Sequence, residues 1–365
     1  MSGDISVAPG HPQRVSAATG VLPEIAARAA EAIAIRHDLH RHPELAFEEH
    51  RTSARVAELL QHWGYAVTTG VGGTGVVGTL QRGNGTRRLG LRADMDALPI
   101  AEESGLAYAS QNEGLMHACG HDGHTAILLS AAHYLAHHGR IDGTLQLVFQ
   151  PAEETGSGAS KMIEDGLFER FPVDAIYGLH NWPGVPVGHF GFVDGPAMAS
   201  VDWARLKVIG KGGHGAEPQG SVDPILVAAH IITALQSVVS RNVDPRQMGV
   251  VTVGSIHGGQ AANVIPDVVE LKLTVRAYLP EVRDTLRRRV TELAEQTAAA
   301  FGARAEIEFP RGFPSVINHP QQTAYIREVA VQGFGAGQVV PDFAPRTASE
   351  DFAFLLQARP GSFVF

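Results

Sequence analysis

The chain has 365 residues, more than one hydrophobic core usually serves, so we expect about two domains. With 44% hydrophobic and 18% charged residues, its composition is that of an ordinary soluble protein. The formal net charge of −9 argues against a nucleic-acid partner, because phosphates require a basic surface. No run of about 20 apolar residues occurs, so no membrane span is expected.

The N-terminal segment and the cysteine content indicate the compartment. Residues 1–13 are polar and lack a basic stretch followed by an apolar one, so secretion by an ordinary signal is not expected. The single cysteine cannot form an intrachain disulfide, and it fits a reducing environment. We therefore expect a cytoplasmic protein.

Helical and β-like patterns alternate along the first half of the chain. Such alternation predicts an α/β fold, with a mostly parallel sheet and helices on both of its faces. The predicted helices cover residues 22–41, 48–63 and 125–138, and the predicted strands cover residues 65–69, 75–80, 88–91, 144–149 and 174–179.

After Pro196 the pattern changes to a βαββαβ order, which is typical of a ferredoxin-like α+β domain. We therefore assign residues 1–194 to a first domain, residues 195–310 to an inserted domain, and residues 311–365 to the first domain resumed. The elements expected here are strands at 201–209, 248–256, 268–279 and 303–309, and helices at 223–242, 280–301, 321–334 and 349–356.

The stretch Met116–Thr125 holds the only cysteine, Cys119, together with His117, His121 and His124. A cysteine among histidines can be a metal ligand, a nucleophile or a small buried apolar side chain. The glycine-rich approach to a helix places His121 and His124 near its N-terminus, where anionic partners are favoured. These residues alone leave the three interpretations open.

Other candidate residues also follow predicted strands, and the carboxyl ends of strands are where such sheets bind ligands. Taken alone, Asp94 and Asp96 favour a solvated turn before Pro99. Cysteine, histidine and carboxylate groups together suit zinc and its first-row neighbours. Of two adjacent glutamates, one would bind metal while the other takes a proton from water. The groups expected at this edge are Asp94 with Asp96, Cys119 with His121, Glu153 with Glu154, and His180.

Together these motifs resemble the M20 metallopeptidase family, in the branch of amidohydrolases that includes hippurate hydrolases and auxin–amino-acid conjugate hydrolases. The resemblance spans essentially the whole chain. It is carried by the segments Leu39–Glu49, Asp94–Pro99, His117–Asp122, Gln150–Glu154, Gly178–Asn181, Lys211–Ala216 and Ala262–Asp267.

The resemblance implies metal-dependent hydrolysis of the amide bond of N-acyl amino acids, such as acetyl or benzoyl derivatives, or of small peptides. Glu153 would be the general base and afterwards the acid to the leaving amine, and Asp96 would orient a ligand histidine. Two divalent ions (zinc, manganese, cobalt or nickel) would be held by Cys119, His121, Glu154 and His180.

The resemblance also implies that the inserted domain is a lid and a homodimer surface. Its histidine, His214, would reach the partner subunit's site and polarise the scissile carbonyl, and Asn263 would be a further substrate contact. Arg276 would bind the substrate's carboxylate, although a structural salt bridge explains this arginine equally well.

One expected ligand is missing from the sequence. The family supplies a last histidine after a C-terminal strand, whereas here Ser349–Phe352 matches the preceding helix and Gly361–Phe365 only the start of that strand. We interpret this as a truncated sequence in preference to a defective chain. Two alternative functions stay open: a catalytically impaired metal-binding homologue, and a hydrolase with Cys119 as nucleophile.

Overall fold

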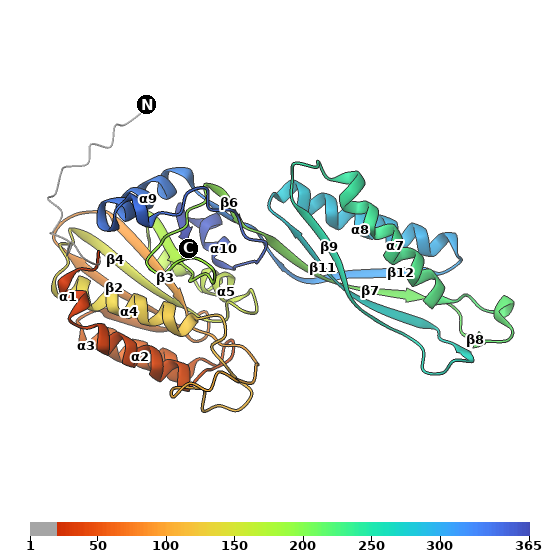
Figure 1. Cartoon of the computed structure of the whole chain (residues 1–365), viewed down its shortest axis with the longest axis horizontal. Helices are drawn as coiled ribbons and strands as arrows, with labels where there is room; N and C mark the ends of the chain where they lie inside the picture. Colours follow the sequence, from red (N-terminus) through yellow and green to blue (C-terminus); the bar gives the residue numbers. More distant parts are fainter. Residues whose placement is uncertain (1–19) are drawn as a thin grey trace.

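The computed structural model describes residues 20–365, which form two lobes joined by extended chain (Figure 1). The N-terminal part of the chain and its C-terminal end, at opposite ends of the colour scale, build the first lobe together. The middle of the chain builds the second lobe. A short pair of strands, β6 (Gly195–Met198) and β13 (Val316–Asn318), ties the two connections between the lobes to each other.

A six-stranded sheet forms the centre of the first lobe, in the order β1-β2-β4-β3-β5-β14. The four strands β4, β3, β5 and β14 run parallel, as predicted. The hairpin β1–β2 is antiparallel, because the few residues between its strands are too short for a crossover. The bounds are β1 (Ala66–Val71), β2 (Gly75–Arg82), β3 (Arg88–Asp94), β4 (Gly143–Gln150), β5 (Ala175–Leu179) and β14 (Gly361–Val364).

Helices cover both faces of this sheet, which confirms the predicted fold class. Successive side chains of β4 point to opposite faces, so Leu147 and Phe149 join one core while Val148 joins the other. The first core is closed by α2, α3 and α4, and the second by α5, α6 and α10. The bounds are α1 (Pro23–Ala26), α2 (Ala29–Arg41), α3 (His50–His62), α4 (His121–His137), α5 (Gly158–Glu164), α6 (Leu167–Arg170), α9 (Pro320–Phe334), the 3-10 helix η2 (Ala336–Gln338) and α10 (Phe352–Ala358).

The second lobe is a four-stranded antiparallel sheet, in the order β12-β7-β11-β9, and two long helices cover one of its faces. Its elements follow the βαββαβ order expected for this part of the chain. The bounds are β7 (Ser200–Ile209), β8 (Gly213–His214), the 3-10 helix η1 (Pro218–Gly220), α7 (Pro224–Asn242), β9 (Gly249–His257), β10 (Val264–Ile265), β11 (Val268–Ala277), α8 (Pro280–Ala300) and β12 (Arg304–Phe313).

Among residues 20–365, α7 alone is long and apolar enough to cross a membrane. One side of this helix packs into the core of the second lobe, where Val227, Ile231 and Leu235 are buried.

Candidate metal centre

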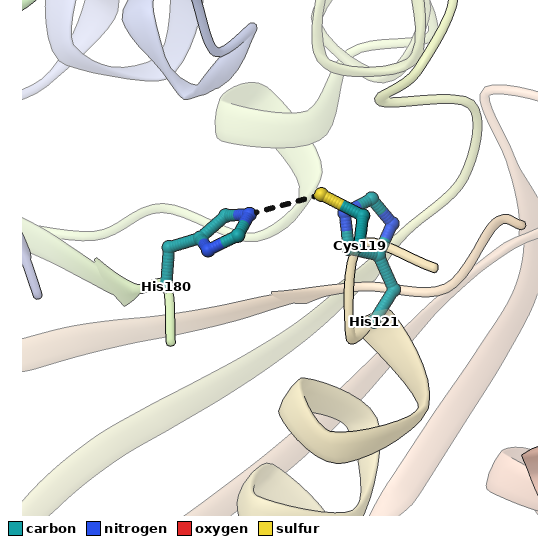
Figure 2. A group of neighbouring side chains, drawn as sticks. All are labelled: Cys119, His121 and His180. Atoms are coloured by element: carbon teal, nitrogen blue, oxygen red, sulfur yellow. Dashed lines mark hydrogen bonds between the residues drawn. The ribbon is translucent and has the colours of Figure 1, made fainter. Parts of the chain in front are cut away.

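The candidate side chains converge where β3, β4 and β5 end at the same edge of the sheet. Cys119 and His121 lie side by side at the start of α4, and His180 faces them from the end of β5 (Figure 2). The Cys119 Sγ atom lies 3.3 Å from His180 Nε2. Gly120 has φ 98°, and a Cβ there would collide with the Asn181 side chain, so only glycine suits this turn.

The His121 ring lies between carboxylates. Its Nδ1 atom lies 3.2 Å from Asp96 Oδ1, whereas its buried Nε2 atom has no hydrogen-bond partner. Glu154 Oε1 is likewise buried without a partner, 3.9 Å from that Nε2 atom. Zinc binds nitrogen and oxygen ligands at about 2.0–2.2 Å, so one ion between these two atoms would satisfy both. The residues present therefore fit a metal ion.

The electrostatics of the centre also suit a cation. Burial raises the pKa of Glu154, even though the neighbouring His121 opposes the shift. For His121, burial alone would lower the pKa, but Asp94 and Asp96 outweigh it and raise the pKa well above its usual value. Burial lowers the pKa of His180 to about 4, which keeps this ring neutral as a metal ligand requires.

The environment of Cys119 bears on the nucleophile hypothesis. Burial raises the pKa of the Cys119 thiol, and although His121 opposes this shift and Glu154 adds to it, the net direction is upward. Nucleophilic cysteines need the opposite, a pKa lowered by cationic neighbours, so this site disfavours a thiol mechanism. A bound cation, in contrast, would deprotonate a coordinating thiol.

Asp96 connects the histidine to the loop that follows β4. Besides facing His121, its carboxylate accepts the backbone N–H groups of Glu153 (3.0 Å) and Glu154 (2.9 Å). Asp94 and Asp96 are both buried, so the solvated turn that they favoured in isolation was wrong. The end of β3 leads into the site, where the partners of these two carboxylates include histidines and backbone N–H groups instead of water.

Sequence reasoning missed a buried ion cluster beside these residues. Arg92 donates to Asp94 (2.7 Å) and to Glu350 (2.8 Å), and it lies 3.3 Å from Asp351. Asp94 also lies 2.6 Å from His124 Nδ1. The available signal was Arg92 itself, a charged residue inside a predicted strand of a buried sheet.

The Glu153–Glu154 loop is closed by a tight contact at Gly158, the first residue of α5. A Cβ at Gly158 would overlap the carbonyl oxygen of Pro151. Gly158→Ala is therefore expected to lower the free energy of unfolding by about 1–3 kcal/mol, measured by urea denaturation. As a control, Gly333→Ala in α9 meets open space and should raise stability by about 0.5–1 kcal/mol. Equal effects of the two substitutions would contradict the steric argument.

Two predicted substrate contacts lie far from this centre. His214 and Asn263 are exposed neighbours at the tip of the second lobe, where Gly215 N–H donates to the Asn263 carbonyl at 2.8 Å. The β8 label in Figure 1 marks this tip, at the end remote from the first lobe. One chain therefore does not bring these residues to its own Cys119–His121 pair.

Arg276 lies at the junction of the lobes, near the end of β11. Its Nη1 atom donates to Ser349 Oγ (2.6 Å) and to the Thr347 carbonyl (3.2 Å). No acidic residue of the described part of the chain forms a salt bridge with it. Arg276 thus connects the second lobe to the segment that leads to Glu350.

Comparisons with known proteins agree with this geometry. The model of peptidase family M20/M25/M40 matches residues 90–365. The chain is 43% identical over 345 residues to the hippurate hydrolase of Campylobacter jejuni, covering 94% of this chain and 90% of that enzyme. It is 45% identical over 334 residues to the N-acetyl-L-cysteine deacetylase of Bacillus subtilis, covering 91% and 79%.

A solved structure shares the fold at comparable identity. The YXEP protein of Bacillus subtilis, described as a dinuclear metal binding peptidase from the M20 family, superposes with a TM-score of 0.80 and 36% identity, over 93% of this chain and 88% of that one. The chain therefore belongs to peptidase family M20/M25/M40 and is a metallo-amidohydrolase.

Proposed function

We propose that the protein hydrolyses the amide bond of N-acyl amino acids, with acetyl or benzoyl as the acyl group. The observation that carries this proposal is the pair of buried, unpartnered ligand atoms, His121 Nε2 and Glu154 Oε1, at the carboxyl edge of the sheet. The names of the relatives, hippurate hydrolase and N-acetyl-L-cysteine deacetylase, support the substrate class.

Cys119, His121, Glu154 and His180 would hold two divalent ions. In support, one group of clustered ligand atoms comprises Cys119, His121 and His180, and a second comprises His121, Glu153 and Glu154. The mixed sulfur, nitrogen and oxygen set suits zinc, manganese, cobalt or nickel. When bound, such ions acidify water and polarise a carbonyl oxygen.

Glu153 would take the proton from the attacking water and later give it to the leaving amine. One of its carboxylate oxygens lies 3.9 Å from His121 Nε2, inside the candidate centre. Burial, and next the carboxylate of Glu350, raise the pKa of Glu153 well above its usual value. A carboxylate whose pKa is raised is a stronger base, so it accepts a proton from water more readily and can pass it on to the leaving amine. Asp96 would hold His121 in its ligating orientation.

The second lobe, residues 195–310, would be a lid and the surface of a homodimer. Its glycine-rich tip presents His214 and Asn263 to solvent, away from the metal centre of the same chain, which supports delivery to a partner subunit's site. His214 would polarise the scissile carbonyl there. Arg276, at the junction of the lobes, would bind the substrate's carboxylate. The single cysteine supports the cytoplasm as the compartment.

Metal removal tests this proposal. Dialysis against a chelator should abolish hydrolysis of N-benzoylglycine, and adding back zinc, manganese, cobalt or nickel should restore it. Metal analysis of the same samples would identify the ion. Activity that resists the chelator but is removed by iodoacetamide would instead assign Cys119 as nucleophile.

A substrate panel distinguishes an active hydrolase from the remaining alternative, a catalytically impaired metal-binding homologue. N-acetyl, N-benzoyl and indole-acetyl amino acids should include at least one good substrate of the metal-loaded protein. Stoichiometric metal binding without turnover of any of them would identify an impaired metal-binding homologue.

A further inference from the structure

We propose that Glu49 is a positioning residue that holds the backbone of Ala152 and thereby aims Glu153 and Glu154 at the metal centre. The inference rests on the proposed function, because it concerns the general base and a ligand assigned there. Glu49 comes from a distant part of the chain, the connection between α2 and α3.

Glu49 is completely buried and touches two other segments. Its Oε1 atom accepts the backbone N–H of Ala152 at 2.8 Å, and its Oε2 atom accepts the hydroxyl of Thr74. No basic side chain among residues 20–365 forms a salt bridge with it. A buried carboxylate without a cation is costly, so these two hydrogen bonds are its compensation.

The backbone conformation of Ala152 is unfavourable and needs stabilisation by another residue. Its φ angle is +53°, in the left-handed region that residues other than glycine rarely adopt. The next residue is Glu153, so a relaxation of Ala152 toward negative φ would rotate the chain that carries both glutamates. The bond from Glu49 opposes this relaxation.

Two carboxylates bind the backbone of this loop. Glu49 accepts the N–H of Ala152, while Asp96 accepts the N–H groups of Glu153 and Glu154. Three consecutive N–H groups are thus fixed by two buried carboxylates. Asp96 also faces His121, whereas the hydrogen bonds of the Glu49 carboxylate go to the backbone of Ala152 and to the Thr74 hydroxyl.

The test compares four variants. They distinguish the effect of the Glu49–Ala152 hydrogen bond from the effect of the Glu49 charge. Glu49→Ala removes the acceptor, Glu49→Asp keeps the charge but withdraws the oxygen by one methylene, and Glu49→Gln keeps an acceptor oxygen in place. Thr74→Val removes the second contact and leaves the bond to Ala152. The readouts are kcat, KM, thermal unfolding, and the visible absorption of the cobalt-loaded protein.

Glu49→Ala and Glu49→Asp should lower kcat by roughly 10- to 100-fold while KM stays within about 2-fold, because small misplacements of catalytic groups have such effects. Both should shift the cobalt absorption, since Glu154 moves relative to the ion. Glu49→Gln should stay within about 3-fold of wild-type kcat, and its cobalt spectrum should match the wild type. Thr74→Val should lower the melting temperature without changing kcat or the spectrum.

The opposing outcomes are distinct. Wild-type kcat and spectrum in Glu49→Ala or Glu49→Asp would overturn the positioning role alone, as would a loss in Glu49→Gln equal to that in Glu49→Ala. If Glu49→Ala does not fold, the kcat and cobalt spectrum of Glu49→Asp provide the test of the positioning role. An equal kcat loss in Thr74→Val would assign the effect to general stability. A wild-type protein that neither binds cobalt nor hydrolyses N-acyl amino acids would refute the proposed function itself.

Discussion

Replacing Glu153 with glutamine is expected to lower kcat for N-benzoylglycine by about 10²-fold or more, as loss of a general base does. Glutamine has the size of glutamate but no carboxylate to take a proton from water. The neighbouring Glu154 keeps its unpartnered oxygen toward His121, so the metal content should stay at the wild-type level. Steady-state kinetics together with metal analysis of the same preparation would measure both quantities.

The matched control is Glu164→Gln, which makes the same chemical change at the exposed end of α5. It should leave both kcat and metal content unchanged. Unaltered turnover in Glu153→Gln would reject the base assignment. Loss of metal from Glu153→Gln would mean that this residue is itself a ligand.

Replacing Arg92 with methionine is expected to lower the free energy of unfolding by about 3–5 kcal/mol, as removal of one partner from a buried ion pair does. The substitution fills much of the same volume, but it leaves Asp94, Glu350 and Asp351 buried without their cation. Denaturant titration of the purified variant would measure the loss. A variant too unstable to purify agrees with the same expectation.

Arg88→Met serves as the control, because Arg88 lies on the same strand but its ion pair with Asp174 is solvent-exposed. Exposed pairs of this kind contribute about 0–1 kcal/mol. A loss in Arg92→Met no larger than that in Arg88→Met would show that the buried cluster does not stabilise the fold.

Periodicity in the sequence predicts most elements but misplaces ends that are set by polar residues. The helix predicted from Thr125 begins at His121, because Gly120 turns the chain and buried polar residues form the first turn. The helix predicted over residues 22–41 is interrupted between α1 and α2. The antiparallel β1–β2 hairpin was also outside the prediction, since strand direction depends on connection length and not on alternation.

The candidate site was predictable where its residues follow strands. Glu154 and His180 follow β4 and β5, which end at one edge because both run parallel to β3, and each of these residues clusters with His121. The bond between Arg92 and Glu350 joins residues 258 positions apart, and no local pattern indicates which buried charges meet. Glu49 lies in the segment Leu39–Glu49, but its contact with the Ala152 backbone depends on tertiary packing and has no local sequence signal.

In the sequence, the second lobe lies between the two segments that build the first lobe. This order affects folding during synthesis on the ribosome. Arg92 emerges early, whereas Glu350 and Asp351 emerge only after the whole second lobe has been translated. The second lobe can complete its own sheet and core in the meantime, because all its strands lie between Ser200 and Phe313. Until then the nascent first lobe has only Asp94 as an acidic partner for Arg92 and an open sheet edge beside β5, a state exposed to aggregation and to chaperones.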